Sequence, residues 1–193
     1  MEETKIAIPH ELFAPAESLS YSGTYALPVL KAGPDLYSFE TPLSWRVDIT
    51  NTGDALLVTG EVEGVGRTAC ARCLDPLDVD VLGDIEGYFL IDEQGTPEDD
   101  EMEEDEFSVL SADNIIDLVP LMQAAILVDL PLVPLCSEDC RGICPDCGVN
   151  LNHETCDCAS KRQAEEEREA QAANPFSVLK DLHLDDNSDS SRS

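Results

Sequence analysis

The eight cysteines of this chain fall into four close pairs, and this spacing constrains the fold more than any other feature. Two cysteines a few positions apart can direct both sulfurs at one ion from a single tight turn. Around Cys144 and Cys147 such a turn is favoured because Pro145 fixes one φ angle and Gly148 lets the chain reverse. Closed sites made of four cysteines are typical of structural rather than catalytic zinc. The sequence therefore predicts one or two structural zinc ions, and the expected metal ligands are Cys70, Cys73, Cys136, Cys140, Cys144, Cys147, Cys156 and Cys158.

Disulfides and redox thiols are the two alternatives for these pairs. The chain opens Met-Glu-Glu-Thr-Lys, which lacks the basic and apolar regions of a secretory signal peptide, so we expect a reducing, cytoplasmic location. In that compartment clustered cysteine pairs bind metal more often than they form bridges. A bridge between Cys156 and Cys158 would also be strained, and one thioredoxin-type dithiol would leave three pairs unexplained. His153 could replace a cysteine as a ligand, but a surface histidine is the simpler interpretation.

Two arrangements of the pairs around two ions are open from the sequence. Local pairing costs least in loop-closure entropy, and it joins Cys144 and Cys147 with Cys156 and Cys158. The remaining four cysteines would then share a second ion and connect two distant parts of the chain. The rival arrangement joins the 136/140 pair with the 144/147 pair, and the 70/73 pair with the 156/158 pair. Entropy favours the first arrangement.

The charge of the chain excludes several classes of function. The formal net charge is −30 at pH 7, which repels nucleic acid and anionic membranes at long range. The longest apolar stretch, residues 115–128, is interrupted by Asp117 and Pro120 and is too short for a transmembrane helix. We expect neither a membrane nor a small-molecule substrate as a partner.

Patterning along the chain predicts an α+β fold: an antiparallel β half packed with a helix, then a cysteine-rich zinc segment. Residues 44–49, 55–62 and 77–81 alternate or read as strands, with turn signals at 51–54 and 75–76, and the last run leads through Gly83 into 85–91. An acidic run over 92–107 predicts a solvated linker. A helix is expected over 118–130 with Asp117 as its cap, and an exposed helix over 159–173.

The expected organisation follows from these segments. Residues 1–91 form the β half, 92–107 the linker, and 108–160 the helix with the cysteine segment, in one globular unit with 1–91. Residues 161–193 form a helical segment and a loose acidic tail, in which 176–182 could make a short docking turn.

The sequence gives no support for an enzyme. It contains no phosphate-binding glycine loop, no nucleophile elbow and no His-Glu-x-x-His motif. Its carboxylates cluster in a run that cannot hold an acid–base pair at a fixed distance. We therefore predict no catalytic residues and no organic cofactor, and we interpret the chain as a scaffold or binding protein.

The motifs named so far occur in an order that resembles one family. The matching segments are Cys70-Ala-Arg-Cys73-Leu-Asp-Pro, Asp117-Leu-Val-Pro, Pro134-Leu-Cys136, Cys140-Arg-Gly-Ile-Cys144-Pro-Asp-Cys147-Gly-Val-Asn-Leu-Asn152, Cys156-Asp-Cys158 and Asn174-Pro-Phe-Ser-Val-Leu-Lys180. By them the chain is identified as a member of the YceD family of large ribosomal RNA subunit accumulation proteins. The resemblance extends from roughly the first strand to Lys180, and the cysteine block is its specific part.

The resemblance implies a bacterial cytoplasmic factor for ribosome biogenesis, needed for 23S rRNA accumulation and large-subunit assembly. It implies no catalytic residue. The acidic composition favours a basic ribosomal protein over direct RNA contact as the partner. The basic residues near the cysteines are few. They are either scattered solubilising charges or a small contact patch that the metal sites would gather: Arg67, Arg72, Arg141, Lys161 and Arg162. The alternative function is a thiol or zinc redox sensor, or a zinc-dependent interaction protein unrelated to rRNA.

Overall fold

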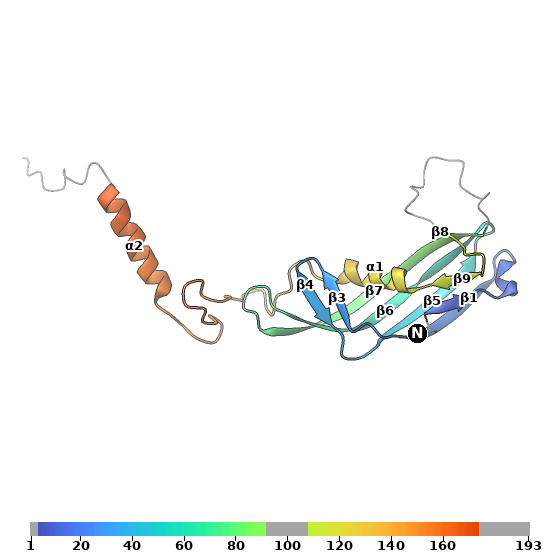
Figure 1. The fold of residues 1–193 in the computed structure, drawn as a ribbon, viewed down its shortest axis with the longest axis horizontal. Helices are drawn as coiled ribbons and strands as arrows, with labels where there is room; N and C mark the ends of the chain where they lie inside the picture. The colour runs from blue at the N-terminus through green and yellow to red at the C-terminus, as the bar shows by residue number, and fades with distance from the viewer. Residues whose placement is uncertain (1–3, 92–107, 174–193) are drawn as a thin grey trace, which may run out of the picture. The chain divides into compact units, whose positions relative to one another are not determined.

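The described residues of the chain form two compact units that divide between Cys140 and Arg141. The structure is a computed structural model, and it describes residues 4–91 and 108–173 (Figure 1). The expected acidic linker over 92–107, the tail beyond residue 173 and its docking turn lie outside the described residues. The four-part organisation expected from the sequence stays a prediction.

The first unit is built around a seven-stranded sheet. Its strands are β2 (Ser18–Tyr25), β3 (Val29–Ala32), β4 (Asp35–Ser38), β5 (Leu43–Asn51), β6 (Ala55–Ala69), β7 (Pro76–Leu90) and β8 (Ser108–Val109). The order is β2-β5-β6-β4-β3, while β7 lies on the other edge of β6 and pairs with β8. All of these pairings are antiparallel except β7 with β8. The expected antiparallel sheet is confirmed.

A second, two-stranded sheet joins the start of the first unit to its end. Strand β1 (Lys5–Ala7) pairs antiparallel with β9 (Ile115–Asp117), so that Lys5 lies opposite Asp117. A short 3-10 helix, η1 (His10–Phe13), follows β1, and its Leu12 is fully buried. The pairing brings the N-terminal strand beside the residues that lead into the first α-helix (Figure 1).

The core lies between the large sheet and helix α1 (Val119–Asp129). Met122 and Ile126 are fully buried, as is Leu118 just before the helix. The helix approaches β7 closely because glycines face it: a Cβ on Gly83 would lie 2.7 Å from the backbone carbon of Ala125. Gly83 lies inside the continuous strand β7, as expected from the run that leads through it from 77–81 into 85–91.

The start of α1 differs from the prediction in one detail. Leu118 occupies the capping position without a side-chain cap, and Asp117 is the last residue of β9. The Asp117 carboxylate still accepts a hydrogen bond from the Val119 N–H at 3.0 Å. Pro120 lies in the first turn, where its missing N–H leaves no bond unmade.

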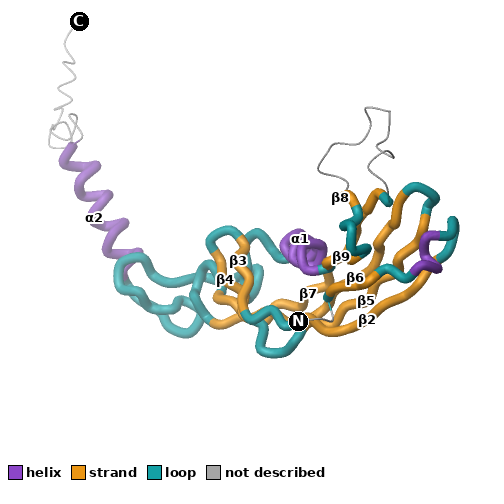
Figure 2. The backbone as a smooth tube through the Cα atoms, turned by 45° about the vertical axis from the view of Figure 1, so that its right-hand side comes forward, coloured by secondary structure: helices purple, strands orange, loops and turns teal. Residues whose placement is uncertain are grey.

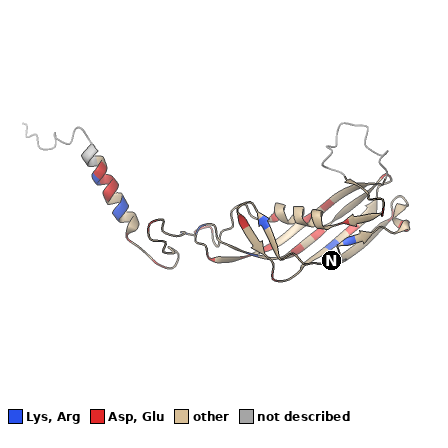
Figure 3. Cartoon of the chain, viewed as in Figure 1, with Lys and Arg blue, Asp and Glu red and all other residues tan. Residues whose placement is uncertain are grey.

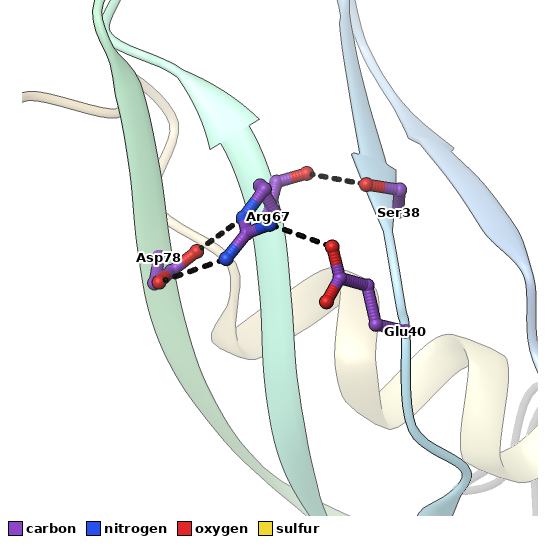
Figure 4. A network of polar contacts seen from close by, with 4 residues as sticks. All are labelled: Ser38, Glu40, Arg67 and Asp78. Carbon is purple, nitrogen blue, oxygen red and sulfur yellow. Dashed lines mark hydrogen bonds and ion pairs between the residues drawn. The ribbon is translucent and has the colours of Figure 1, made fainter.

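The outer face of the sheet is polar and mostly acidic (Figure 3). Arg67 on β6 donates to Asp78 on β7 at 2.8 Å and to Glu40 at 2.6 Å, and its backbone C=O accepts from the Ser38 hydroxyl (Figure 4). The guanidinium beside Asp78 lowers the pKa of that carboxyl. These exposed contacts connect β4, β6 and β7 near the sheet end that carries the first cysteines, and each ion pair adds little stability by itself.

The second unit is short and rich in turns. An isolated bridge between Ile143 and Asn150 opens it, and helix α2 (Cys158–Ala173) closes its described part. Every residue from Ala159 to Ala170 is exposed, so the predicted exposed helix is confirmed, and it begins one residue earlier. No helix among the described residues is long and apolar enough to cross a membrane.

Candidate metal centres

The first cysteine pair lies in the turn that joins β6 to β7. The Cys70 N–H donates to Asp75 C=O at 2.8 Å, and the Leu74 N–H donates back to Cys70 C=O at 2.9 Å. Leu74 adopts a positive φ of 64°. The ladder resumes where Ala69 meets Pro76, so the long β hairpin ends in a compact turn that holds both sulfurs on one side.

The Cys144 turn repeats this backbone arrangement in the second unit. The Cys144 N–H donates to Val149 C=O at 2.8 Å, and the Gly148 N–H donates to Cys144 C=O at 2.8 Å. Gly148 has a φ of 74° at the position that Leu74 occupies in the first turn. Two turns with different sequences thus converge on one geometry, and glycine suits the positive φ that leucine tolerates at a cost.

Each turn meets a second cysteine pair, and the eight sulfurs form two separate groups of four. Within each group all sulfurs lie within 4.8 Å of one another. In the first group the Cys70 and Cys140 sulfurs are 3.8 Å apart, and the Cys73 and Cys136 sulfurs are 3.6 Å apart. Four sulfurs at 2.3 Å from a central zinc are about 3.8 Å from each other. The groups are Cys70, Cys73, Cys136 and Cys140, and Cys144, Cys147, Cys156 and Cys158.

This grouping is the first of the two arrangements that the sequence left open. The observed sulfur distances are also far longer than a disulfide bond of about 2.0 Å. Both groups could hold a metal ion, and four cysteines at these distances suit a tetrahedral ion. His153 is exposed, and neither group needs it.

The first group joins the hairpin tip to the segment that follows α1. The Ala71 N–H donates to Pro134 C=O at 2.8 Å, and Arg72 donates to the carbonyls of Cys140 at 3.1 Å and Glu138 at 3.3 Å. Cys70, Cys73 and Cys140 are buried, whereas Cys136 is exposed. Sequence reasoning missed this positioning role of Arg72, because carbonyl partners leave no signal in a sequence.

The second group is contained in residues 144–158. Cys158 is the first residue of α2, so the helix begins at a candidate ligand. Arg162, one turn later, pairs with Asp146 at 2.6 Å and connects the helix to the Cys144 turn. The Leu151 N–H donates to Gly142 C=O at 2.8 Å and closes the loop at its base.

The thiols of the first group differ in acidity. Burial raises the pKa of Cys70, but hydrogen bonds from the backbone N–H groups of Cys73, Cys136 and Arg72 outweigh it and lower the pKa to about 6. A backbone N–H at Asp75 lowers the pKa of Cys73, but burial and the neighbouring thiols raise it further, so the net shift is upward. One thiolate therefore forms readily in this group, and further ionisation requires a cation to offset the repulsion.

The second group likewise contains one thiol with a lowered pKa and others with raised pKa values. Backbone N–H groups of Cys147 and Asp146 lower the pKa of Cys144 to about 7, against the effect of burial. The thiol of Cys147 raises the pKa of Cys158 to about 12, with burial as the next cause. In both groups the acidic thiol is the first cysteine of the tight turn, where N–H groups converge on its sulfur.

Most of the basic residues near the cysteines have local partners, and the contact patch expected of them stays a prediction. Arg67 is held by Asp78 and Glu40, and Arg162 is held by Asp146. Arg72 and Arg141 donate to backbone carbonyls around the cysteines. Carboxylates on a neighbouring strand and in the Cys144 turn therefore neutralise Arg67 and Arg162 locally.

Comparisons with known proteins agree with the cysteine pattern. A family described as "Large ribosomal RNA subunit accumulation protein YceD" matches residues 58–183. The match includes both cysteine groups and α1, but it begins within β6, so the expected resemblance from the first strand onward was too wide. No solved structure matches the chain.

Relatives among curated proteins are uncharacterized. One from Mycobacterium tuberculosis and one from Mycobacterium bovis are each 38% identical over 112 residues, which is 58% of this chain and 52% of the relative. One from Mycobacterium leprae is 28% identical over 110 residues, which is 57% of this chain and 49% of the relative. The chain spans about half the length of these relatives. Because the family match covers well over half of the chain and contains both cysteine groups, the chain belongs to the YceD family of large ribosomal RNA subunit accumulation proteins.

Proposed function

We propose that this chain is a non-enzymatic factor that supports 23S rRNA accumulation and assembly of the large ribosomal subunit in the bacterial cytoplasm. The family match over residues 58–183 carries this proposal. The parts of the match with a clear physical role are the two cysteine groups and the helix that packs on the sheet, and these determine the shape of the protein rather than a reaction.

We further propose that each cysteine group binds one structural zinc ion. Sulfur distances of 3.6 and 3.8 Å in the first group suit tetrahedral Zn–S geometry. The convergent N–H groups at Cys70 and Cys144 stabilise thiolates of the kind that zinc requires. Four protein ligands leave no open position for a substrate, which supports a structural role.

A basic protein of the large subunit fits the surface better than RNA does. The chain carries a net charge of −30, and Arg67 and Arg162 are already paired with carboxylates. Phosphate backbones require unpaired cations to release counterions. The expected complex is therefore one with a basic ribosomal protein, weakened by salt and not formed with RNA alone.

Deletion of the gene in its own host tests the function. We expect a lower ratio of 23S to 16S rRNA and fewer large subunits on a sucrose gradient, both restored by the wild-type gene. Cys70→Ser/Cys73→Ser should fail to restore them, whereas Lys31→Ala, an exposed change on β3, should succeed. Unchanged 23S rRNA and large-subunit levels in the deletion strain would refute the proposal.

A further inference from the structure

Strand β2 is an edge of the large sheet that lacks the usual protection. It pairs with β5 along all of Ser18–Tyr25, and no strand lies on its other edge within the described residues (Figure 2). Its sequence, Ser-Leu-Ser-Tyr-Ser-Gly-Thr-Tyr, contains no charged residue and no proline. Natural edges are normally blocked by lysine, proline or a bulge, because an open edge accepts another strand.

A groove of about 490 Å³ adjoins this edge. Its lining includes three consecutive residues of β1, Lys5–Ala7, and four consecutive residues of β2, Tyr21–Thr24. Side chains alternate between the two faces of a strand, so a groove that touches every residue in turn lies along the backbone edge. The space therefore runs beside the backbone of β2 rather than over one face of the sheet.

Trp45 lies at this groove with an unsatisfied donor. Its side chain is 4% exposed, and its indole N–H has no hydrogen-bond acceptor among the described atoms. Gly23 lies against the ring, since a Cβ there would be 2.7 Å from Trp45 Cζ2. Buried donors in folded proteins normally have an acceptor. This nitrogen is itself buried beside Gly23, so Trp45 reports on the groove but does not offer a donor to a ligand there.

A second groove, of about 420 Å³, shares Ser22–Thr24 and Trp45 with the first and extends over the outer face of the sheet. Small residues of β2, Ser22–Thr24, line its start, Ser44, Trp45 and Arg46 line it on β5, and it ends at Glu61 and Glu63 on β6. Glu61 is paired with Arg46 at 2.6 Å. Glu63 accepts from the Ser44 hydroxyl at 3.0 Å and has no cationic partner among the described residues. A long cationic side chain from the β2 edge could therefore lie over the serines and reach Glu63.

We propose that the β2 edge binds an extended, basic segment of a partner protein, which adds one strand to the sheet. Backbone hydrogen bonds to β2 would hold the segment, and a lysine or arginine would extend toward Glu63. Asp80, Asp84 and Glu86 on the same outer face of the sheet favour a cationic partner and disfavour RNA. This site is independent of the proposed role in rRNA accumulation.

A peptide of alternating lysine and valine, about as long as β2, is the probe for the full-length, zinc-loaded chain. The chain has one tryptophan, so its fluorescence and its single indole N–H resonance report on the groove. We expect the peptide to shift this resonance and the amide resonances of β2. The same peptide with alternate backbone nitrogens methylated keeps its charge but cannot pair fully with a strand, and it should not bind.

Two pairs of matched variants distinguish binding at the β2 edge from non-specific electrostatic attraction of the peptide. Ser22→Lys should weaken peptide binding about fivefold, the factor expected for one new like-charge contact in water. Val65→Lys adds the same charge on β6, outside both grooves, and should change binding by less than about twofold because exposed distant charges are screened. Glu63→Gln should weaken binding about twofold to fivefold, as for an exposed ion pair. Glu86→Gln, which removes the same charge from β7, should have a smaller effect.

Several results would overturn the inference. Equal binding of the methylated peptide would mean that charge alone attracts the probe. Equal effects of the two lysine variants would place the peptide elsewhere. Shifts of the β2 resonances with protein concentration, without peptide, would assign the edge to a second copy of the chain. Shifts caused by an RNA oligonucleotide but not by the peptide would assign the surface to nucleic acid.

Discussion

Removing the first metal group should destabilise the sheet, whereas removing the second should not. The change is Cys70→Ser/Cys73→Ser, and its matched control is Cys144→Ser/Cys147→Ser, which alters the same turn geometry in the other unit. Each double variant should lose one of two zinc ions, which elemental analysis measures. The two variants should differ in stability because the two lost ions connect different parts of the chain.

The magnitude follows from the length of chain that each ion closes. Cys73 and Cys136 meet across 63 positions, whereas Cys147 and Cys156 are nine positions apart. On the chain-entropy estimate for cross-links, the first closure stabilises the fold by about 4 kcal/mol and the second by about 2.6 kcal/mol. The first loop closure stabilises the unit that contains Trp45, whereas the second stabilises the other unit.

Urea unfolding followed by the fluorescence of Trp45 is the assay. Because this tryptophan lies in the core of the first unit, its signal reports on that unit. With an m-value of about 2 kcal/mol/M, the loss of about 4 kcal/mol lowers the midpoint by roughly 2 M in Cys70→Ser/Cys73→Ser. The control variant should keep the wild-type midpoint. Equal shifts in both variants, or two zinc ions retained in either, would refute the reasoning.

Three further predictions follow from single positions. Leu74→Gly should stabilise the first unit by about 0.5–1 kcal/mol in the same urea assay. The substitution relieves the backbone strain of a leucine at positive φ, and the exposed leucine side chain packs little. A loss of stability would contradict this. Gly83→Ala should destabilise the first unit by about 1–3 kcal/mol, because the new Cβ would lie 2.7 Å from the α1 backbone. An unchanged midpoint of urea unfolding would show that the helix can shift freely. Zinc affinity, measured by competition with a chelator, should rise by at least about tenfold per pH unit between pH 6 and 8. The reason is that the pKa values of Cys73 and Cys136 are raised, so zinc must displace the protons of these thiols. A zinc affinity independent of pH would be inconsistent with the release of thiol protons.

Features with a local signal could be predicted from the sequence. Alternation over 44–49 and 55–62 predicted β5 and the first part of β6, and the apolar spacing around Met122 predicted α1. The cost of closing loops favoured the observed grouping of the cysteines, because short closures retain more chain entropy. In each case the determining interactions lie within a few residues or depend on sequence distance alone.

Features that depend on register or on a distant neighbour could not be predicted. The close approach of Ala125 to Gly83 is not evident until α1 is placed against β7. Arg67 resembles a binding residue until the β6–β7 register sets it opposite Asp78. Strands β1 and β9 have three residues each, too few for a periodic pattern. Leucine gives no indication of the positive φ at residue 74, whereas glycine at residue 148 does.

The pairing of β1 with β9 determines when the first unit can be completed during translation. Lys5 meets Asp117, about 110 positions later, so β1 has no partner until most of the unit has been made. At 5–20 residues per second this interval is roughly 5–20 s. The second unit has no such delay, since its four cysteines lie within residues 144–158. A nascent chain therefore exposes the inner face of its sheet for seconds before β9 and α1 arrive to cover it.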